Sequence, residues 1–144
     1  MLTPRLKAFL ETHHVAYSAM PHRPAYTAME VAQSLHVPGQ EMAKTVIVDL
    51  DGRLAMAVLP GTRHVSLAKL EKSSGAQHAR IAHEGEFRFD FPDCEVGAMP
   101  PFGNLFNMEV LVEEGVISAQ DLKLFQYLDD PQQAWAAIRK FYEL

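Results

Sequence analysis

The sequence predicts an α/β domain of the α+β kind, built around a mixed, largely antiparallel sheet. Helical patterns begin at clear capping residues, two apolar runs meet at Asp51-Gly52, and the strand-helix-strand repeat of a doubly wound fold is absent. The 144 residues are 48% hydrophobic and 22% charged, which supplies enough apolar material for one core. We therefore expect a single domain over residues 1–144.

Helices are expected where a capping residue precedes apolar residues spaced three or four apart. Thr3 and Pro4 provide such a start for a short first helix. Thr27 and Glu30 stand in capping-box register before a second helix that reaches Leu35. The stretch "SLAKLEKSSG", residues 66–75, predicts a third helix that ends at its glycine.

The clearest strand signal is "KTVIVDLDGRLAMAVLPG", residues 44–61. Its two apolar runs are joined by Asp51-Gly52, a dipeptide that favours a tight hairpin because both residues tolerate positive φ. Residues 107–116, "NMEVLVEEGV", predict a further strand, and Asp130-Pro131 predicts the start of a last helix. The stretch "EFRFDF", residues 86–91, fits either a strand or a helix.

Net charge, hydrophobic run lengths and the content of cysteine and histidine exclude several classes of function. A formal net charge of -5 argues against nonspecific coating of nucleic acid or anionic membrane. No apolar run approaches the roughly 20 residues that span a bilayer, and the first residues do not resemble a signal peptide. The seven histidines and one cysteine form no metal-ligand pattern. We expect a cytoplasmic protein without metal or cofactor.

Lys44 begins a strand whose alternate residues are Val46, Val48 and Leu50. If that face is buried, the lysine stem is drawn inward as well. The ordinary interpretation is that the stem packs on apolar surface while the ammonium reaches water. The alternative is a fixed cation that faces an anionic ligand.

The stretch "VGAMPPFGN", residues 96–104, places two prolines between two glycines. Pro100 and Pro101 restrict the backbone, and Gly97 allows positive φ, so neighbouring N–H groups point in fixed directions. Such amides bind carbonyl or phosphate oxygens. A rigid turn without further function is the alternative.

Taken together, "AKTVIVDLDGRLAMAVLPG", "GAMPPFG" and "HRPAYTAMEVAQSLHVPGQEMAKT" resemble the signatures of the YbaK/ProX family of aminoacyl-tRNA deacylases. This family is related to the editing domain of bacterial prolyl-tRNA synthetases. The resemblance extends from about Val15 to Val116. It implies a strongly curved mixed sheet covered by helices. Where the family often carries an aspartate after the proline loop, this chain has Glu113 or Glu114.

The resemblance also implies site residues. Lys44 would contribute to catalysis or grip the terminal nucleotide by facing its phosphate or ribose, while Gly97 and the amides of Ala98 and Met99 would hold the ester as further catalytic groups. Substrate-binding residues would be those at the pocket edge, namely His22, Tyr26, Val46, Pro100, Pro101, Phe102 and Gly103. Strand alternation suggests that Val46, Met56 and Met99 line the same pocket.

The expected function is trans-editing hydrolysis of a mischarged aminoacyl-tRNA at its terminal adenosine, with an aminoacyl-tRNA synthetase as a candidate partner. The alternative is a non-catalytic module that binds a small aminoacyl or nucleotide ligand or a protein. A metal or thiol enzyme is a third class, in which Cys94 would act as nucleophile, although a structural thiol is favoured. The basic residues Arg63, His64, Lys69 and Lys72 suit either a tRNA acceptor stem or an ordinary solvated surface.

Overall fold

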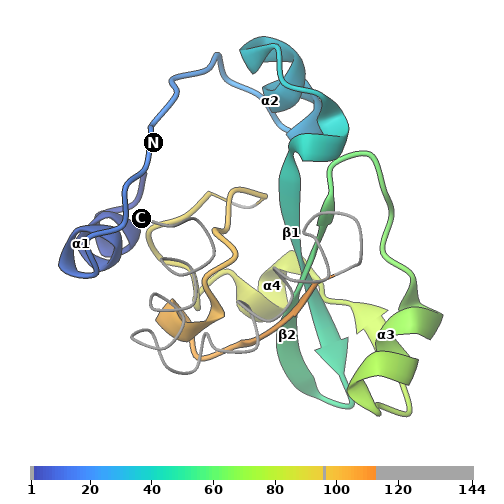
Figure 1. Cartoon of the computed structure of the whole chain (residues 1–144). Helices are drawn as coiled ribbons and strands as arrows, with labels where there is room; N and C mark the ends of the chain where they lie inside the picture. The colour runs from blue at the N-terminus through green and yellow to red at the C-terminus, as the bar shows by residue number, and fades with distance from the viewer. Residues whose placement is uncertain (1, 96, 113–144) are drawn as a thin grey trace.

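The computed structural model describes residues 2–95 and 97–112. The elements are α1 (Pro4–Thr12), α2 (Ala28–Leu35), η1 (Gly39–Glu41), β1 (Ala43–Leu50), β2 (Arg53–Pro60), α3 (Leu67–Ser74), β3 (Ala79–Ile81), α4 (Glu84–Phe87), η2 (Gly103–Leu105) and β4 (Glu109–Val112). In this part of the chain, helical elements precede the β1-β2 hairpin, and a helical element precedes each of β3 and β4 (Figure 1).

The four described strands form one mixed sheet in the order β3-β1-β2-β4. β1 and β2 pair antiparallel along their whole length, from Ala43 opposite Pro60 to Leu50 opposite Arg53. β3 joins β1 antiparallel, whereas β4 joins β2 in parallel. The predicted α+β class with a mixed sheet is therefore confirmed.

The turn between β1 and β2 has the geometry that Asp51-Gly52 predicts. Both residues have positive φ, 53° and 87°, which matches the right-handed twist of the two strands. The Asp49 carboxylate accepts a hydrogen bond from the Gly52 N–H at 2.6 Å and so fixes the turn.

α1 and α2 begin at the predicted caps Thr3 and Thr27, and α3 ends at the predicted Gly75. The Thr27 hydroxyl accepts from the Glu30 N–H at 3.2 Å, and the Glu30 carboxylate accepts from the Thr27 N–H at 3.1 Å. These two bonds satisfy N–H groups that the first turn of a helix leaves without partners. The hydroxyls of Thr3 and Ser66 cap α1 and α3 by accepting from the Leu6 and Lys69 N–H groups, and Gly75 ends α3 with φ of 75°.

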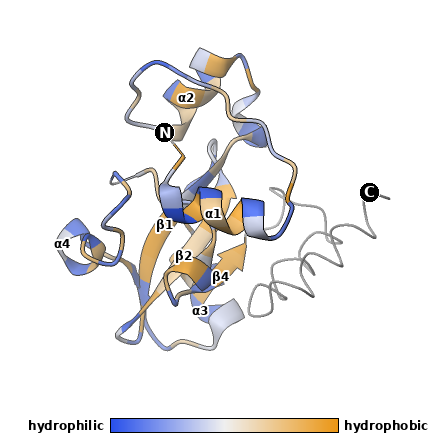
Figure 2. Ribbon diagram, turned by 90° about the vertical axis from the view of Figure 1, so that its left-hand side faces the viewer, coloured by the Kyte–Doolittle hydropathy of each residue, from blue (hydrophilic) through white to orange (hydrophobic). Residues whose placement is uncertain are grey.

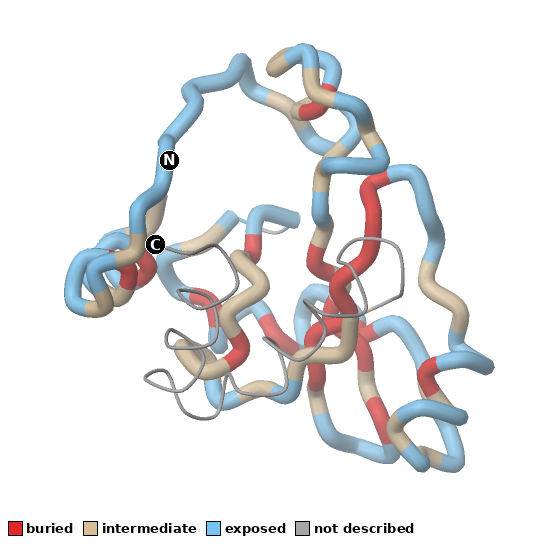
Figure 3. Tube along the Cα trace, in the orientation of Figure 1, coloured by how far each residue is buried: buried red, intermediate tan, exposed pale blue. Residues whose placement is uncertain are grey.

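Buried side chains lie on both faces of the hairpin. β2 is the most deeply buried strand (Figure 3), and Figure 2 shows that the hairpin strands are largely hydrophobic. We call the two groups the loop-side and the helix-side cores. The loop-side core consists of Ile47, Met56, Ala82, Phe87, Phe91 and Met99. The helix-side core consists of Val48, Leu50, Ala55, Ala57 and Leu70 of α3. Successive residues of each strand thus enter different cores, as strand alternation requires.

The "EFRFDF" stretch contains the end of α4 and the turn that follows it, and it is not a strand. α4 ends at Phe87, and Phe87 and Phe91 pack edge to face in the loop-side core with ring centroids 6.1 Å apart. Phe89 is 79% exposed. The sequence pattern alone left both a strand and a helix possible for this segment. The structure decides between them, because the two buried rings, Phe87 and Phe91, have helical spacing.

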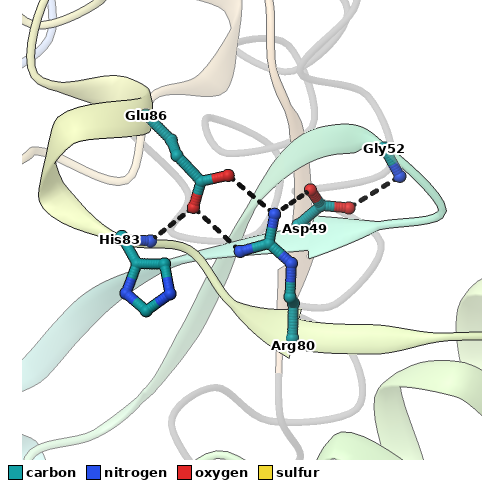
Figure 4. A network of polar contacts seen from close by, with 5 residues as sticks. All are labelled: Asp49, Gly52, Arg80, His83 and Glu86. Atoms are coloured by element: carbon teal, nitrogen blue, oxygen red, sulfur yellow. Dashed lines mark hydrogen bonds and ion pairs between the residues drawn. The ribbon is translucent and has the colours of Figure 1, made fainter.

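β3 was not predicted, because three residues carry too little pattern. Arg80 of β3 holds it in place by bonding Asp49 of β1 at 2.7 Å and Glu86 of α4 at 2.6 Å (Figure 4). Glu86 also accepts from the His83 N–H at 2.7 Å. The three charged side chains therefore join β1, β3 and α4 at one edge of the sheet.

Two predictions lie outside the described residues: the helix from Asp130-Pro131 and the contribution of Glu113 or Glu114. Within the described part of the chain, no helix is long and apolar enough to cross a membrane.

Candidate functional site

The proline loop, residues 97–103, is held by its own backbone. Gly97 has φ of 89°, a conformation that side chains with a Cβ disfavour. The Ala98 N–H donates to the Glu95 carbonyl at 2.9 Å, and the Phe102 N–H donates to the Pro100 carbonyl at 2.8 Å. The sequence suggested that glycine is required at position 97, and the structure shows that the reason is the backbone conformation.

Gly97 and the two amides that were expected to hold an ester, those of Ala98 and Met99, differ in their hydrogen-bond partners. The Ala98 amide already has the Glu95 carbonyl, and the Gly97 N–H lies 3.2 Å from the Met99 sulfur, a weak acceptor. Among the residues that the structure describes, the Met99 N–H has no acceptor. The Met99 side chain is buried in the loop-side core and fixes this amide relative to the sheet.

The end of the loop packs closely against the start of β4. A Cβ on Gly103 would collide with the Met108 carbonyl oxygen and would lie 2.6 Å from Cγ2 of Val110. The Phe106 and Met108 N–H groups both donate to the Gly103 carbonyl, at 2.9 and 3.0 Å. Gly103 is therefore required by space, and its backbone connects the loop to the sheet.

α1 packs against this same segment from the start of the chain. The Phe9 ring meets Phe102 edge to face with centroids 5.8 Å apart. Arg5 donates to the Leu105 carbonyl at 3.2 Å, and its guanidinium lies 5.5 Å from the centre of the Phe106 ring. Sequence reasoning did not assign Arg5 a role, because its carbonyl partner is a hundred residues away.

Lys44 lies at the start of β1, opposite Leu59. Its side chain is partly buried, and its ammonium donates to the Gly61 carbonyl across 3.5 Å, a long hydrogen bond. The Gly61 N–H in turn donates to the Met42 carbonyl at 2.6 Å. The stem lies against the protein while the charge is held near one carbonyl, an arrangement that fits snorkelling and also leaves donors for a ligand.

The sheet separates residues that were expected to line one pocket. Val46 pairs with Ala57 and packs on the helix-side core, whereas Met56 and Met99 belong to the loop-side core. Val46 therefore does not share a face with Met56 and Met99, which corrects that expectation. Lys44 shares the face of Val46 by strand alternation. In residues 2–95 and 97–112, no hydrogen bond joins Lys44 to the proline loop.

His22 and Tyr26 lie on the exposed segment that runs from α1 to α2 (Figure 3). The His22 Nδ1 lies 2.7 Å from the Arg23 carbonyl. The Tyr26 N–H donates to the Glu30 carboxylate at 2.7 Å, and the residue is 94% exposed. Both side chains are accessible to a large ligand.

Cys94 packs against the loop-side core. Burial, together with the nearby Asp93 charge, raises the pKa of its thiol. The thiolate is the nucleophilic form, so a raised pKa makes Cys94 less reactive. This geometry favours the structural role.

Asn104 is a polar residue that sequence reasoning did not single out. Its Oδ1 is buried and has no hydrogen-bond partner within the described part of the chain. Its position directly after Gly103 makes it a neighbour of the loop. In the same part of the chain, no group of three His, Cys, Asp or Glu side chains is placed to hold a metal ion.

Comparison with known proteins places the chain in one family. The protein-family model described as the aminoacyl-tRNA editing domain matches residues 22–124. Proline--tRNA ligases of Bacillus mycoides (strain KBAB4) and Bacillus cereus (strain AH187) are each 25% identical over 89 residues, which is 62% of this chain but only 16% of each ligase.

Two solved structures share the fold. The hypothetical protein APE2540 superposes with a TM-score of 0.63 at 21% identity, over 76% of this chain and 73% of that one. A protein proposed to be a trans-editing enzyme for prolyl tRNA synthetase superposes with a TM-score of 0.57 at 20% identity, over 81% of this chain and 76% of that one.

Proposed function

Because this chain belongs to the aminoacyl-tRNA editing domain family, related to the editing domain of prolyl-tRNA synthetase, we propose that it hydrolyses mischarged aminoacyl-tRNA. The bond that breaks is the ester between the amino acid and the terminal adenosine. The proposal covers the whole chain, residues 1–144, acting in trans. The observation that carries it is the rigid proline loop, whose Met99 N–H has no acceptor in the described residues.

The loop supplies the catalytic effect in this proposal. The Met99 N–H donates to the ester carbonyl, and the oxygen of a water molecule attacks the carbonyl carbon. The C–O bond to the ribose then breaks, and the products are a free amino acid and a ribose hydroxyl. An aligned donor to the developing oxyanion typically contributes about 3 kcal/mol, or roughly a hundredfold in rate.

Gly97 and Ala98 act by fixing the loop rather than by donating directly. Pro100, Pro101, Phe102 and Gly103 form the rigid border against which the aminoacyl group lies. Pocket size then selects the amino acid, because one methylene changes binding by only about 1–3 kcal/mol and synthetases need a second sieve.

Lys44 binds the terminal nucleotide in this proposal. Its ammonium has three donors, and the long bond to the Gly61 carbonyl occupies one of them. A phosphate or ribose oxygen would take another. Val46 lies on the same strand face, and His22 and Tyr26 on the exposed segment would contact the nucleotide from the other side.

The test is a deacylation assay over tRNAs charged correctly and incorrectly, including alanyl- and cysteinyl-tRNA for proline. We expect hydrolysis of a mischarged species, with kcat/KM lowered about 10- to 100-fold in Lys44→Ala, since a hydrogen bond from a charged donor contributes about 1.5–3 kcal/mol. Lys7→Ala, at an exposed position of α1, is the matched control and keeps full activity.

A pair of glycine variants separates catalysis from stability. Gly97→Ala and Gly75→Ala both place alanine at positive φ where nothing lies within 4 Å of the new Cβ. Loss of activity in Gly97→Ala alone, with similar unfolding midpoints, supports the loop as the catalytic element. If the wild type left the whole panel intact but bound a small aminoacyl or nucleotide ligand, the domain would instead be a binding module.

A further inference from the structure

Gly61, whose carbonyl accepts from the Lys44 ammonium, is a buried residue directly after β2. A Cβ built on it would lie 3.2 Å from the Gly39 carbonyl oxygen, 3.3 Å from the Met42 carbonyl oxygen and 3.4 Å from the Ala28 Cβ. Its backbone therefore packs against α2, η1 and the residue that precedes β1. We call this meeting point the junction, and it lies at the end of the hairpin opposite its turn (Figure 1).

Hydrogen bonds within the junction fix the backbone that carries the Gly61 carbonyl. The Gly61 N–H donates to the Met42 carbonyl at 2.6 Å, and the Met42 N–H donates to the Gly39 carbonyl at 3.3 Å. These two bonds run in series from the end of β2 to η1. On the other side, the Arg63 N–H donates to the Pro60 carbonyl at 3.0 Å and closes a turn around Gly61. The Gly61 carbonyl is thus held from both directions along the chain.

A fixed acceptor matters for Lys44 because its ammonium ends a flexible four-carbon stem. With one donor on the Gly61 oxygen, the ammonium keeps two donors for other partners. Without that acceptor, the stem would lose its rotamer freedom only when a ligand binds, and affinity would fall. The distance of 3.5 Å is at the outer limit of a hydrogen bond, so a small shift of the carbonyl breaks the contact.

A side chain at position 61 would cause such a shift. Contacts of 3.2 and 3.3 Å are tighter than most that a Cβ makes, and both partners are backbone carbonyls. Gly39 differs in this respect, although it belongs to the same junction. A Cβ there would meet Met29 Cε at 2.6 Å and Thr62 Cγ2 at 3.1 Å, which are the ends of side chains on exposed residues. Those ends can move aside without moving the backbone.

We propose that Gly61 is a positioning residue for Lys44. It presents its carbonyl to the ammonium, and it bears no side chain that would push that carbonyl away. Gly61 does not touch the substrate itself. The role given to Lys44, binding of the terminal nucleotide, rests on the proposed function. In this arrangement, the packing of α2 and η1 on the end of β2 determines where the cation of the site lies.

The first experiment measures kcat and KM for the mischarged tRNA that the wild type hydrolyses, in Gly61→Ala, Lys44→Ala and the double variant. We expect Gly61→Ala to raise KM about three- to tenfold with kcat nearly unchanged, because Lys44 contributes binding in this proposal. The double variant should be no worse than Lys44→Ala alone, since both changes remove the same interaction. Gly39→Ala is the matched control at the junction and should keep KM within about twofold.

Two kinetic results would contradict the positioning role. One is a set of effects that multiply in the double variant, because Gly61 would then act independently of Lys44. The other is an equal rise of KM in Gly39→Ala, because crowding of the junction would then explain the loss.

A second measurement does not depend on hydrolysis. Nitrogen–proton NMR spectra detect a lysine ammonium when hydrogen bonding slows the exchange of its protons with water. The wild type should show a Lys44 signal, identified by its absence in Lys44→Arg. Gly61→Ala should remove this signal, and Gly39→Ala should retain it. Absence of the signal from the wild type would reject the contact even where Gly61→Ala does not fold, and so would a signal that persists in a folded Gly61→Ala.

The two measurements separate this proposal from the proposed function. If the wild type hydrolysed no tRNA while the Lys44 signal behaved as expected, the deacylase would be rejected and the positioning by Gly61 would stand. Hydrolysis that depends on Lys44 but not on Gly61 would reject the positioning and keep the deacylase.

Discussion

Two glycines of the proline loop are required for different physical reasons. Gly97 has open space around it, and only its φ of 89° resists a side chain. Gly103 has an ordinary φ, but the Met108 carbonyl and the Val110 side chain occupy the place of a Cβ. Gly97 therefore sets the conformation of the loop, and Gly103 sets how closely the loop approaches β4.

Gly103→Ala should destabilise the protein more than Gly97→Ala does. An alanine at positive φ costs about 1–2 kcal/mol, whereas an added methyl against a backbone carbonyl forces a shift that costs about 1–3 kcal/mol or more. Urea unfolding midpoints measure the difference. Adding Val110→Ala to Gly103→Ala should restore little, since the carbonyl stays in place. Equal midpoint shifts in the two single variants would contradict this account.

At the scale of elements, the short strand β3 depends on side chains rather than on its own length. Its three residues pair with β1 at Val48, Asp49 and Leu50. The bonds from Arg80 lower the pKa of Glu86 to about 2, and the His83 N–H adds to this effect. On the neighbouring turn, N–H groups of Gln77 and His78 lower the pKa of Asp51.

The contribution of Glu86 to stability should disappear in acid. In the unfolded chain its carboxylate takes up a proton near the ordinary value of 4.5, and in the folded protein near 2. The contribution is thus complete above about pH 4.5 and is lost as the pH falls toward 2. Unfolding free energies of wild type and Glu86→Gln should differ at pH 6 and converge near pH 2. Glu84→Gln, on the same helix but outside the Arg80 network, is the control, and a gap that persists in acid would argue against the network.

At the scale of the whole molecule, the two ends of the described chain support one loop. α1 reaches Phe102, Leu105 and Phe106 through Phe9 and Arg5. The sheet supports the same segment from the other side through Gly103 and Met108. Removing either support should loosen the loop without touching the bonds inside it.

Phe9→Ala should lower stability by about 1–2 kcal/mol, less than a fully buried phenylalanine, because the residue is half-buried. Phe89→Ala is the matched control, since Phe89 is 79% exposed and should cost under about 0.5 kcal/mol. Urea unfolding of both variants makes the comparison. Similar midpoints would mean that α1 does not hold the 102–106 segment.

Local chemistry made much of the fold predictable. The caps at Thr3 and Thr27, the glycine end of α3 and the Asp51-Gly52 turn each depend on residues within four positions of one another, so the sequence alone determines them. At Gly97 the sequence allowed either a close approach or a positive φ, and the structure shows the positive φ with open space around the residue. The roles of Lys44, Gly97, Ala98 and Met99 in catalysis stay predictions.

Tertiary structure decided what depends on contacts between distant segments. The face that each strand residue occupies places Val46 and Met99 in different cores, and the parallel pairing of β4 depends on long-range packing. β3 pairs with β1 far along the chain, and Arg80 adds an ion pair with Asp49 across the sheet. Position 103 has no room for a side chain only because the Met108 backbone lies against it. Residues that contact each other in this way are far apart in the chain, so no local sequence pattern predicts their contacts.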